Sequence, residues 1–148
     1  MKNTTRKSFH VILLLLFISV QYQCNEDPLI DLIPQVFVEE TINLNNFEYS
    51  QLNNLGGFVY ITGGVRGIII YRKSTNEYLA FERNCTYQPF DACANVKVDE
   101  STLFMIDTCC SSTFSFDGIP TGGPAQIPLR QYRTFLDHSL LTITSDFN

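Results

Sequence analysis

Two short segments hold most of the side chains that could do chemistry in this chain. Residues 85–87 read Cys-Thr-Tyr, and residues 107–114 read Asp-Thr-Cys-Cys-Ser-Ser-Thr-Phe. Thiols and carboxylates of this kind can form disulfides, hold a soft metal ion or ligate an iron–sulfur cluster. A glycine- and proline-rich run over residues 118–125 follows and ends shortly before Pro128-Leu129. These segments are the candidate functional region.

A nucleophilic enzyme is not supported, because a reactive cysteine or serine needs a general base within hydrogen-bond reach. The chain has two histidines, His10 and His138. His10 falls in an N-terminal targeting segment, and His138 falls in a predicted turn far along the chain from either cysteine segment. The sequence also lacks a P-loop, a dinucleotide-binding fingerprint and a calcium loop. The enzyme question stays open, but the residues favour a non-enzymatic protein without catalytic residues.

The N-terminus has the layout of a secretory signal over residues 1–23. It begins with the basic residues Lys2, Arg6 and Lys7, and an apolar run over residues 11–20 follows that is too short to span a bilayer. We therefore expect this segment to be removed from the mature protein.

Cys24 comes directly after this segment, as the lipidated cysteine does in bacterial lipoproteins. We expect lipidation at Cys24, a tether over residues 24–35 and one domain over residues 36–148. The protein would then be a membrane-anchored lipoprotein of the cell envelope, on its periplasmic or surface side. The alternative is ordinary cleavage, with Cys24 as a spare thiol.

The chain has five cysteines, an odd number that invites a special role for one of them. If Cys24 carries a lipid, an even number of cysteines remains that could pair as disulfides in an oxidising compartment: Cys85, Cys93, Cys109 and Cys110. Four cysteines allow three pairings, and the sequence alone does not choose among them.

The charge of the mature chain excludes nucleic acid as a partner. Ten Lys and Arg residues, less the three in the signal, leave seven against 15 acidic residues, a formal net charge of −8. Affinity for a phosphate backbone rests mainly on Lys and Arg contacts, which an acidic domain without a basic patch does not supply. The arginines of the domain are expected to be solvated strand charges, and the protein partner is unknown.

Short runs of alternating or β-branched residues dominate the rest of the sequence. The pattern predicts strands at 36–38, 41–44, 58–62, 67–72, 77–82, 96–98, 102–106, 113–116, 132–136 and 140–144, with one helical turn within 45–54. The hairpin of 67–72 and 77–82 is the clearest of these, because its first strand is dense in isoleucine. An all-β sandwich or barrel is expected.

The order of these segments resembles the Rieske iron–sulfur domain, an antiparallel β core that carries a small subdomain of two cluster-binding loops. The likeness covers roughly residues 58–144. It is carried by residues 78–85 (YLAFERNC), 110–114 (CSSTF) and 123–132 (GPAQIPLRQY). The chain looks like the cluster-poor, Rieske-like lipoproteins of the Bacteroidetes–Flavobacteria group.

The ligand positions of the resemblance are largely changed. A Rieske centre takes two Cys thiolates on one iron and two His nitrogens on the other. Here Cys85 stands at the first thiolate position and Tyr87 at the first histidine position. Asp107 stands at the second thiolate position and Cys110 at the second histidine position. We therefore expect no cofactor and no metal at these degenerate cluster positions.

The resemblance also implies two disulfides. Many respiratory Rieske proteins tie their two loops with an extra disulfide, which corresponds here to Cys93–Cys109. It would close a loop of about 15 residues and contribute roughly 3 kcal/mol. Cys85 and Cys110 then face each other, and we expect them to be joined as well. The alternatives are a zinc ion held by several cysteines, or an unusual 2Fe-2S cluster that uses Tyr87 or Asp107.

Two functions are consistent with these residues. The first is an envelope-anchored Rieske-like domain that has lost its 2Fe-2S cluster and has a non-enzymatic binding or structural role. The second is a redox protein, either an electron-transfer iron–sulfur protein or a thiol–disulfide module with non-standard ligands. The loss of both histidine ligands favours the first.

Overall fold

The computed structural model describes residues 33–145, which form two antiparallel sheets and one 3-10 helix. The all-β fold class predicted from the sequence is confirmed. Within the same residues, no helix has the length and apolar character that a membrane crossing requires. The predicted signal segment, Cys24 and most of the predicted tether lie outside the described residues.

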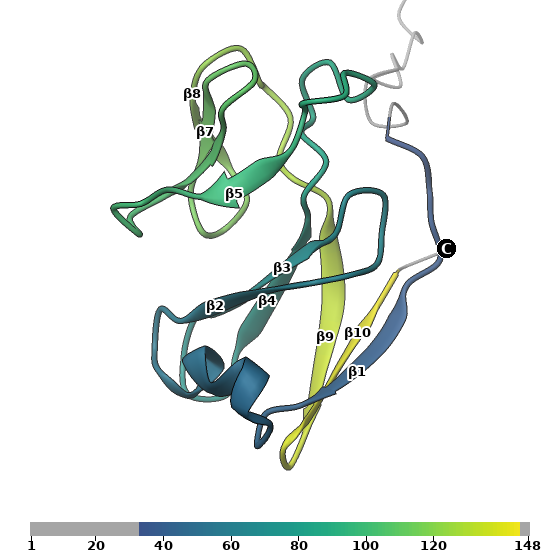
Figure 1. The fold of residues 1–148 in the computed structure, drawn as a ribbon, viewed down its shortest axis with the longest axis vertical. Helices are drawn as coiled ribbons and strands as arrows, with labels where there is room; N and C mark the ends of the chain where they lie inside the picture. Colours follow the sequence, from purple (N-terminus) through teal and green to yellow (C-terminus); the bar gives the residue numbers. More distant parts are fainter. Residues whose placement is uncertain (1–32, 146–148) are drawn as a thin grey trace, which may run out of the picture.

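The larger sheet has six strands and forms the body of the domain (Figure 1). In spatial order its strands are β1 (Glu39–Asn43), β10 (Leu140–Thr144), β9 (Gln131–Asp137), β4 (Tyr78–Glu82), β3 (Ile68–Arg72) and β2 (Phe58–Ile61). The 3-10 helix, Phe47–Asn53, lies between β1 and β2 in the chain and contacts β2 and β3. It confirms the helical turn predicted in this segment.

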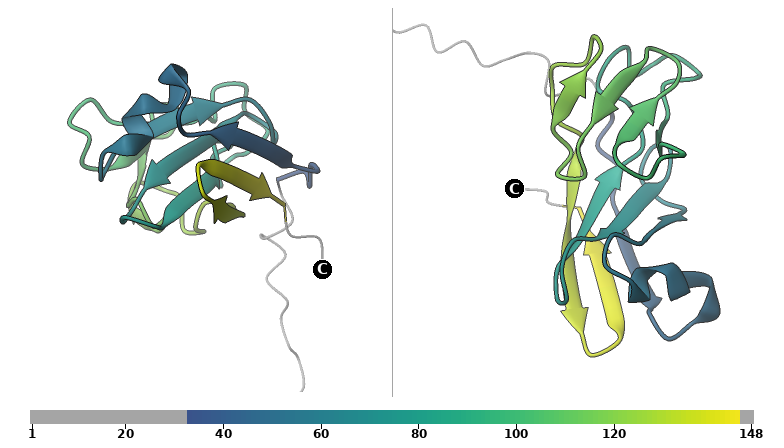
Figure 2. Two further views of the ribbon diagram at one scale, coloured as in Figure 1. Left: turned by 90° about the horizontal axis from the view of Figure 1, so that it is seen from below. Right: turned by 90° about the vertical axis from the view of Figure 1, so that its left-hand side faces the viewer.

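The smaller sheet has four strands and is inserted in the chain between β4 and β9. Its strands follow the chain order β5 (Val96–Val98), β6 (Met105–Asp107), β7 (Ser112–Phe114) and β8 (Pro120–Gly122). Figures 1 and 2 show it stacked on one end of the six-stranded sheet, away from the β9–β10 turn. Both cysteine segments belong to this inserted subdomain or to its junction with the larger sheet.

The β3–β4 hairpin is confirmed, and it contributes to two apolar cores. Ile68 and Ile70 pack in one core, whereas Ile69 between them packs in the other. Successive side chains of a strand point to opposite faces, so a run of buried isoleucines requires cover on both faces of the sheet. The second core contains Phe81 and Cys85 together with apolar residues of the four-stranded sheet. It joins the subdomain to the body.

A buried carboxylate fixes the turn between β2 and β3. Glu82, at the end of β4, is 0% exposed. Its Oε2 accepts hydrogen bonds from the Val65 N–H and the Tyr132 hydroxyl, both at 2.7 Å. Its Oε1 accepts from the backbone N–H groups of Arg66 and Asn84, both at 2.9 Å. The turn is therefore folded around the Glu82 side chain.

Two strand predictions in the subdomain were wrong in detail. The strand predicted at 102–106 begins only at Met105, because residues 99–104 form a tight turn in which Thr102 has a φ of 58°. The Thr102 N–H donates to the Asp99 carbonyl at 2.8 Å within that turn. In addition, β8 lies inside the glycine- and proline-rich run over residues 118–125, where no strand was predicted.

The last residues of the predicted tether pack against the domain. Ile33 is 6% exposed, and its carbonyl accepts a hydrogen bond from the Arg130 guanidinium at 2.5 Å. The same guanidinium donates to the Pro34 carbonyl at 2.7 Å. Arg130 therefore binds backbone carbonyls and is not simply a solvated strand charge.

Candidate functional site

The two cysteine segments meet where the subdomain joins the larger sheet. Cys85 follows β4, and its backbone N–H donates a hydrogen bond to the Ala94 carbonyl at 3.2 Å. Beside it, Asn84 and Asn95 form an isolated antiparallel bridge. This bridge closes the first loop, residues 85–94. The second segment, residues 107–114, includes the turn between β6 and β7, residues 108–111, which carries Cys109 and Cys110. Strand pairing thus brings together residues that are far apart in the sequence.

The predicted disulfide Cys93–Cys109 is confirmed. It joins the end of the first loop to the β6–β7 turn, with a Cα–Cα distance of 5.5 Å and a sequence separation of 16 residues. Both cysteines are exposed. The bond covalently fixes the distance between the two loops that carry the other site residues.

Cys85 and Cys110 face each other as predicted, but the disulfide expected between them is not formed. Their sulfur atoms are 3.9 Å apart, whereas a disulfide needs about 2.05 Å. The Cys110 sulfur also lies 3.3 Å from Asp107 Oδ2 and 3.0 Å from Ser112 Oγ. The Cys110 thiol therefore contacts two polar side chains of its own segment and is not bonded to Cys85.

Asp107 completes a group of three possible ligands. The ligand atoms of Cys85, Asp107 and Cys110 all lie within 4.8 Å of one another. Asp107 and Cys85 are both 0% exposed, and Cys110 is partly exposed. The other carboxylate oxygen of Asp107 accepts a hydrogen bond from the Cys109 N–H at 2.8 Å. Three of the four degenerate cluster positions predicted from the sequence therefore converge.

Burial keeps the thiol of one member of this group, Cys85, protonated. It raises the pKa of the Cys85 thiol, and the nearby Asp107 carboxyl and Cys110 thiol raise it further. A backbone hydrogen bond from Tyr87 acts in the opposite direction. Cys85 is consequently a protonated thiol at neutral pH and a poor nucleophile in the described conformation.

Tyr87, the fourth degenerate position, lies at the rim of the site. It packs against the core that contains Cys85 and Cys110. Together with Pro89, Phe90 and residues of the segment 124–127, it lines a mostly apolar cavity of about 420 Å³.

The residues present do not fit a Rieske 2Fe-2S cluster. Such a cluster needs two imidazole ligands, and the convergent donors here are two thiols and one carboxylate. The described residues contain a single histidine, His138, whose side chain is 93% exposed. Figure 1 places its turn, between β9 and β10, at the opposite end of the molecule from the four-stranded sheet. No imidazole is available to the site from residues 33–145.

Arg66 positions the first loop, a role that was not predicted from the sequence, where the arginines were expected to be solvated charges. Its side chain donates to the Asn84 side-chain oxygen and to the carbonyls of Ala92 at 2.7 Å and Asp91 at 2.6 Å. A weaker contact reaches the Pro89 carbonyl at 3.5 Å. No local pattern signals this function, because all of these acceptors are at least 18 residues away in the sequence.

We expect Arg66→Lys to loosen the first loop. A lysine keeps the charge but lacks the planar fork that reaches several acceptors at once. Exchange of the Asp91 and Ala94 amides, which bond to carbonyls inside this loop, should accelerate by about tenfold. Hydrogen exchange followed by NMR measures this change.

Arg72→Lys is the matched control for Arg66→Lys. Arg72 also binds backbone carbonyls, those of Leu52 at 3.1 Å and Thr75 at 3.0 Å, but outside the first loop. It should leave the Asp91 and Ala94 amides unchanged. Equal exchange of these amides in wild type and Arg66→Lys would show that the guanidinium does not hold the loop.

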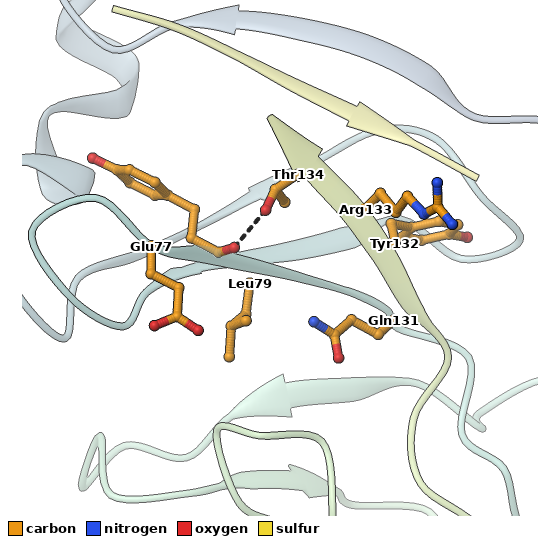
Figure 3. A pocket seen from close by; sticks show the side chains of 7 residues that line it. Glu77, Leu79, Gln131, Tyr132, Arg133 and Thr134 are labelled. Atoms are coloured by element: carbon orange, nitrogen blue, oxygen red, sulfur yellow. Dashed lines mark hydrogen bonds between the residues drawn. The ribbon is translucent and has the colours of Figure 1, made fainter. Parts of the chain in front are cut away.

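A second cavity, of about 500 Å³, lies between β4 and β9 (Figure 3). The two strands pair only near Ala80 and Phe81, and beyond that point the Thr134 hydroxyl donates to the Tyr78 carbonyl at 2.6 Å. Figure 3 shows Glu77, Leu79 and Gln131 around this cavity. It contains no group of three or more possible metal ligands among the described residues.

The chain is similar in structure to a ferredoxin, although no match is found by sequence. No protein-family model matches the chain, and a search of curated proteins gives no match. Among solved structures, the chain is similar to the ferredoxin of carbazole 1,9a-dioxygenase from Nocardioides aromaticivorans IC177, with 16% sequence identity and a TM-score of 0.48. The likeness covers 76% of this chain and 100% of that one.

Proposed function

We propose that this protein is a Rieske-like domain of the cell envelope, anchored through Cys24, that carries no 2Fe-2S cluster. Its role is then non-enzymatic, as a binding or structural module. The observation that carries the proposal is the donor set of the site. Cys85, Asp107 and Cys110 converge, and no histidine of the described residues lies near them.

The packing of the site supports a scaffold more than an electron carrier. Phe81 and Phe114 are at most 1% exposed and pack in the same core as Cys85. The disulfide Cys93–Cys109 ties the loops without a cofactor. The subdomain therefore has covalent and apolar contacts to hold its shape where a cluster would otherwise join the loops.

A thiol–disulfide redox module is the second candidate. It is favoured by the 3.9 Å approach of the Cys85 and Cys110 sulfurs. Such a module needs an attacking thiolate, however, and burial keeps the Cys85 thiol protonated by raising its pKa. The observation therefore supports this candidate less well than the scaffold.

A spectrum and an iron assay test the proposal. The full chain, produced in cells that assemble iron–sulfur clusters and purified without air, should be colourless and free of stoichiometric iron and sulfide. Restoring the Rieske ligand set with Tyr87→His, Asp107→Cys and Cys110→His provides the matched positive control. Stoichiometric iron and sulfide with visible charge-transfer bands in the wild-type protein would overturn the proposal.

A further inference from the structure

The spacing of the three convergent donors suits one metal ion. In a tetrahedral zinc site, two sulfur ligands are about 3.8 Å apart, and a sulfur and an oxygen ligand are about 3.5 Å apart. The Cys85 and Cys110 sulfurs are 3.9 Å apart, and the Cys110 sulfur is 3.3 Å from Asp107 Oδ2. Both separations are close to edges of such a tetrahedron.

We infer that Cys85, Asp107 and Cys110 bind a single soft divalent metal ion, of the zinc class, with one coordination position left for an outside ligand. Two thiolates disfavour hard ions such as magnesium and calcium, which prefer oxygen ligands. This site differs from a Rieske centre in its ligands and in holding one ion. It replaces the expectation, drawn from the sequence, that the position is free of metal.

The polar contacts of Cys110 support an ion at this place. Its sulfur lies within hydrogen-bonding distance of Asp107 Oδ2 and Ser112 Oγ and also contacts the Cys85 sulfur. A thiol has one proton and can donate to only one of these partners at a time. An ion between Cys85, Asp107 and Cys110 would satisfy all three ligand atoms at once.

The surrounding hydrogen bonds are those that a metal site requires around its ligands. The Cys109 N–H donates to Asp107 Oδ1 and leaves Oδ2 directed at Cys110. The Ser112 oxygen accepts a hydrogen bond from the Ala125 N–H at 3.0 Å and lies 3.0 Å from the Cys110 sulfur. Such outer contacts orient ligands and tune the affinity for the ion.

A thiol must lose its proton to coordinate a metal ion, so binding of one divalent ion by Cys85 and Cys110 releases two protons to solvent.

The fold holds the ligands in place before the ion arrives. Cys109 lies between Asp107 and Cys110 in the chain, and its disulfide to Cys93 fixes the turn that carries them. Because this disulfide uses Cys109, the adjacent Cys110 is the thiol left for the metal. Cys110 is the partly exposed member of the group.

This inference rests on the proposed function, because a cluster would use the same donors. The experiment uses the full chain with Cys24→Ser, so that Cys85 and Cys110 are the remaining free thiols outside the disulfide. The protein is purified without air, stripped of metal with a chelator and titrated with Co²⁺. One equivalent should produce thiolate-to-cobalt charge-transfer bands and the visible bands of a tetrahedral ion, and Zn²⁺ should displace it.

Two variants assign the ligands. Cys110→Ser should weaken Co²⁺ binding by at least about 100-fold, since even outer partners of a metal cost about 10–100-fold when removed, and the single remaining thiolate should give weaker charge-transfer bands per bound ion. Asp107→Asn keeps the side-chain shape and should weaken binding by at least about tenfold. Asp99→Asn, at an acidic residue outside the group, is the control and should leave the Co²⁺ titration unchanged.

The outcomes separate this inference from the proposed function. Iron and sulfide in the purified wild type would overturn both. A protein free of iron that gives no thiolate-to-cobalt bands would overturn the metal site and leave the cluster-free domain in place. A Cys85–Cys110 disulfide found by mass spectrometry in the native chain, or Co²⁺ binding that survives both ligand variants, would equally overturn the metal site.

Discussion

Glu82→Gln should lower the free energy of unfolding by about 3 kcal/mol, although it changes one atom of a side chain that never meets solvent. The two Glu82 oxygens accept four hydrogen bonds, three from backbone N–H groups and one from the Tyr132 hydroxyl. A glutamine side chain offers one oxygen and one NH₂ group, and the NH₂ group cannot accept a hydrogen bond from any of these donors.

Neither orientation of the glutamine avoids a loss. With its NH₂ group at the Oε1 position, it opposes the Arg66 and Asn84 N–H groups. With its NH₂ group at the Oε2 position, the Tyr132 hydroxyl can rotate to accept, but the Val65 N–H is left without a partner. Each buried, unsatisfied donor costs about 1–3 kcal/mol, and the remaining bonds lose the assistance of the charge.

Little room exists for the turn to relax. A Cβ atom added at Gly64 would overlap Glu82 Oε2 and lie 2.6 Å from the Tyr132 hydroxyl oxygen, so the backbone already approaches the carboxylate closely. Gly64 also has a φ of 61°, which favours glycine. Burial and the Glu82 hydrogen bond raise the pKa of Tyr132, which keeps its hydroxyl protonated as the donor.

Chemical denaturation followed by fluorescence or circular dichroism measures the Glu82→Gln effect. Glu77→Gln is the matched control, because Glu77 is an exposed glutamate at the other end of the same hairpin, 3.6 Å from Lys73. It should change stability by less than about 0.5 kcal/mol. A Glu82→Gln protein within about 1 kcal/mol of wild type, measured on the same scale of stability, would show that the turn does not depend on the carboxylate.

Glu82 matters for the site because it folds the turn that carries Arg66. The Arg66 N–H binds the carboxylate, and the Arg66 side chain binds the carbonyls of the first cysteine loop. Loss of the carboxylate should therefore disturb the position of Cys85 indirectly, first through the Arg66 N–H and then through the Arg66 side chain. The Glu82→Gln protein should also bind Co²⁺ more weakly than wild type, since its ligands would be less well positioned.

Local patterns predicted the parts of the fold that depend on local physics. The isoleucines at 68–70 are buried on both faces of a strand. A segment so rich in β-branched residues favours a strand over other structures. The turn 99–104 and strand β8 were missed for the opposite reason. The turn depends on the positive φ of Thr102, and β8 depends on its pairing with β7. Neither feature can be predicted from the residue types.

The sequence predicted which cysteines come together at the candidate site, but not which contacts the Cys110 thiol makes there. The resemblance placed Cys85 opposite Cys110 and paired Cys93 with Cys109, because the positions of two loops on a shared scaffold follow from sequence order. The state of the Cys110 thiol depends on Asp107 and Ser112 at 3.0–3.3 Å. Those distances are set by the β6–β7 turn in three dimensions. The roles of Glu82 and Arg66 were missed because their partners come from distant segments.

Replacing Cys93 and Cys109 together by alanine should lower the free energy of unfolding by about 3 kcal/mol. Both side chains are exposed, so little apolar packing is lost with the sulfur atoms. The main effect is then on the unfolded chain, which gains the freedom of a loop that spans 16 residues in the native protein. Denaturation of wild type and variant under non-reducing conditions measures the difference.

The same double variant separates the disulfide's effect on stability from its effect on the site. Cys85, Asp107 and Cys110 are all retained, so the ligands for Co²⁺ are complete, but the turn between β6 and β7 is no longer tied to the first loop. We expect the cobalt bands to persist with weaker affinity. Reduced wild type is the matched control and should show the same loss of stability. A loss below about 1 kcal/mol in both, against the range expected for a native disulfide, would mean that Arg66 and the strand pairing hold the loops together without the covalent bond.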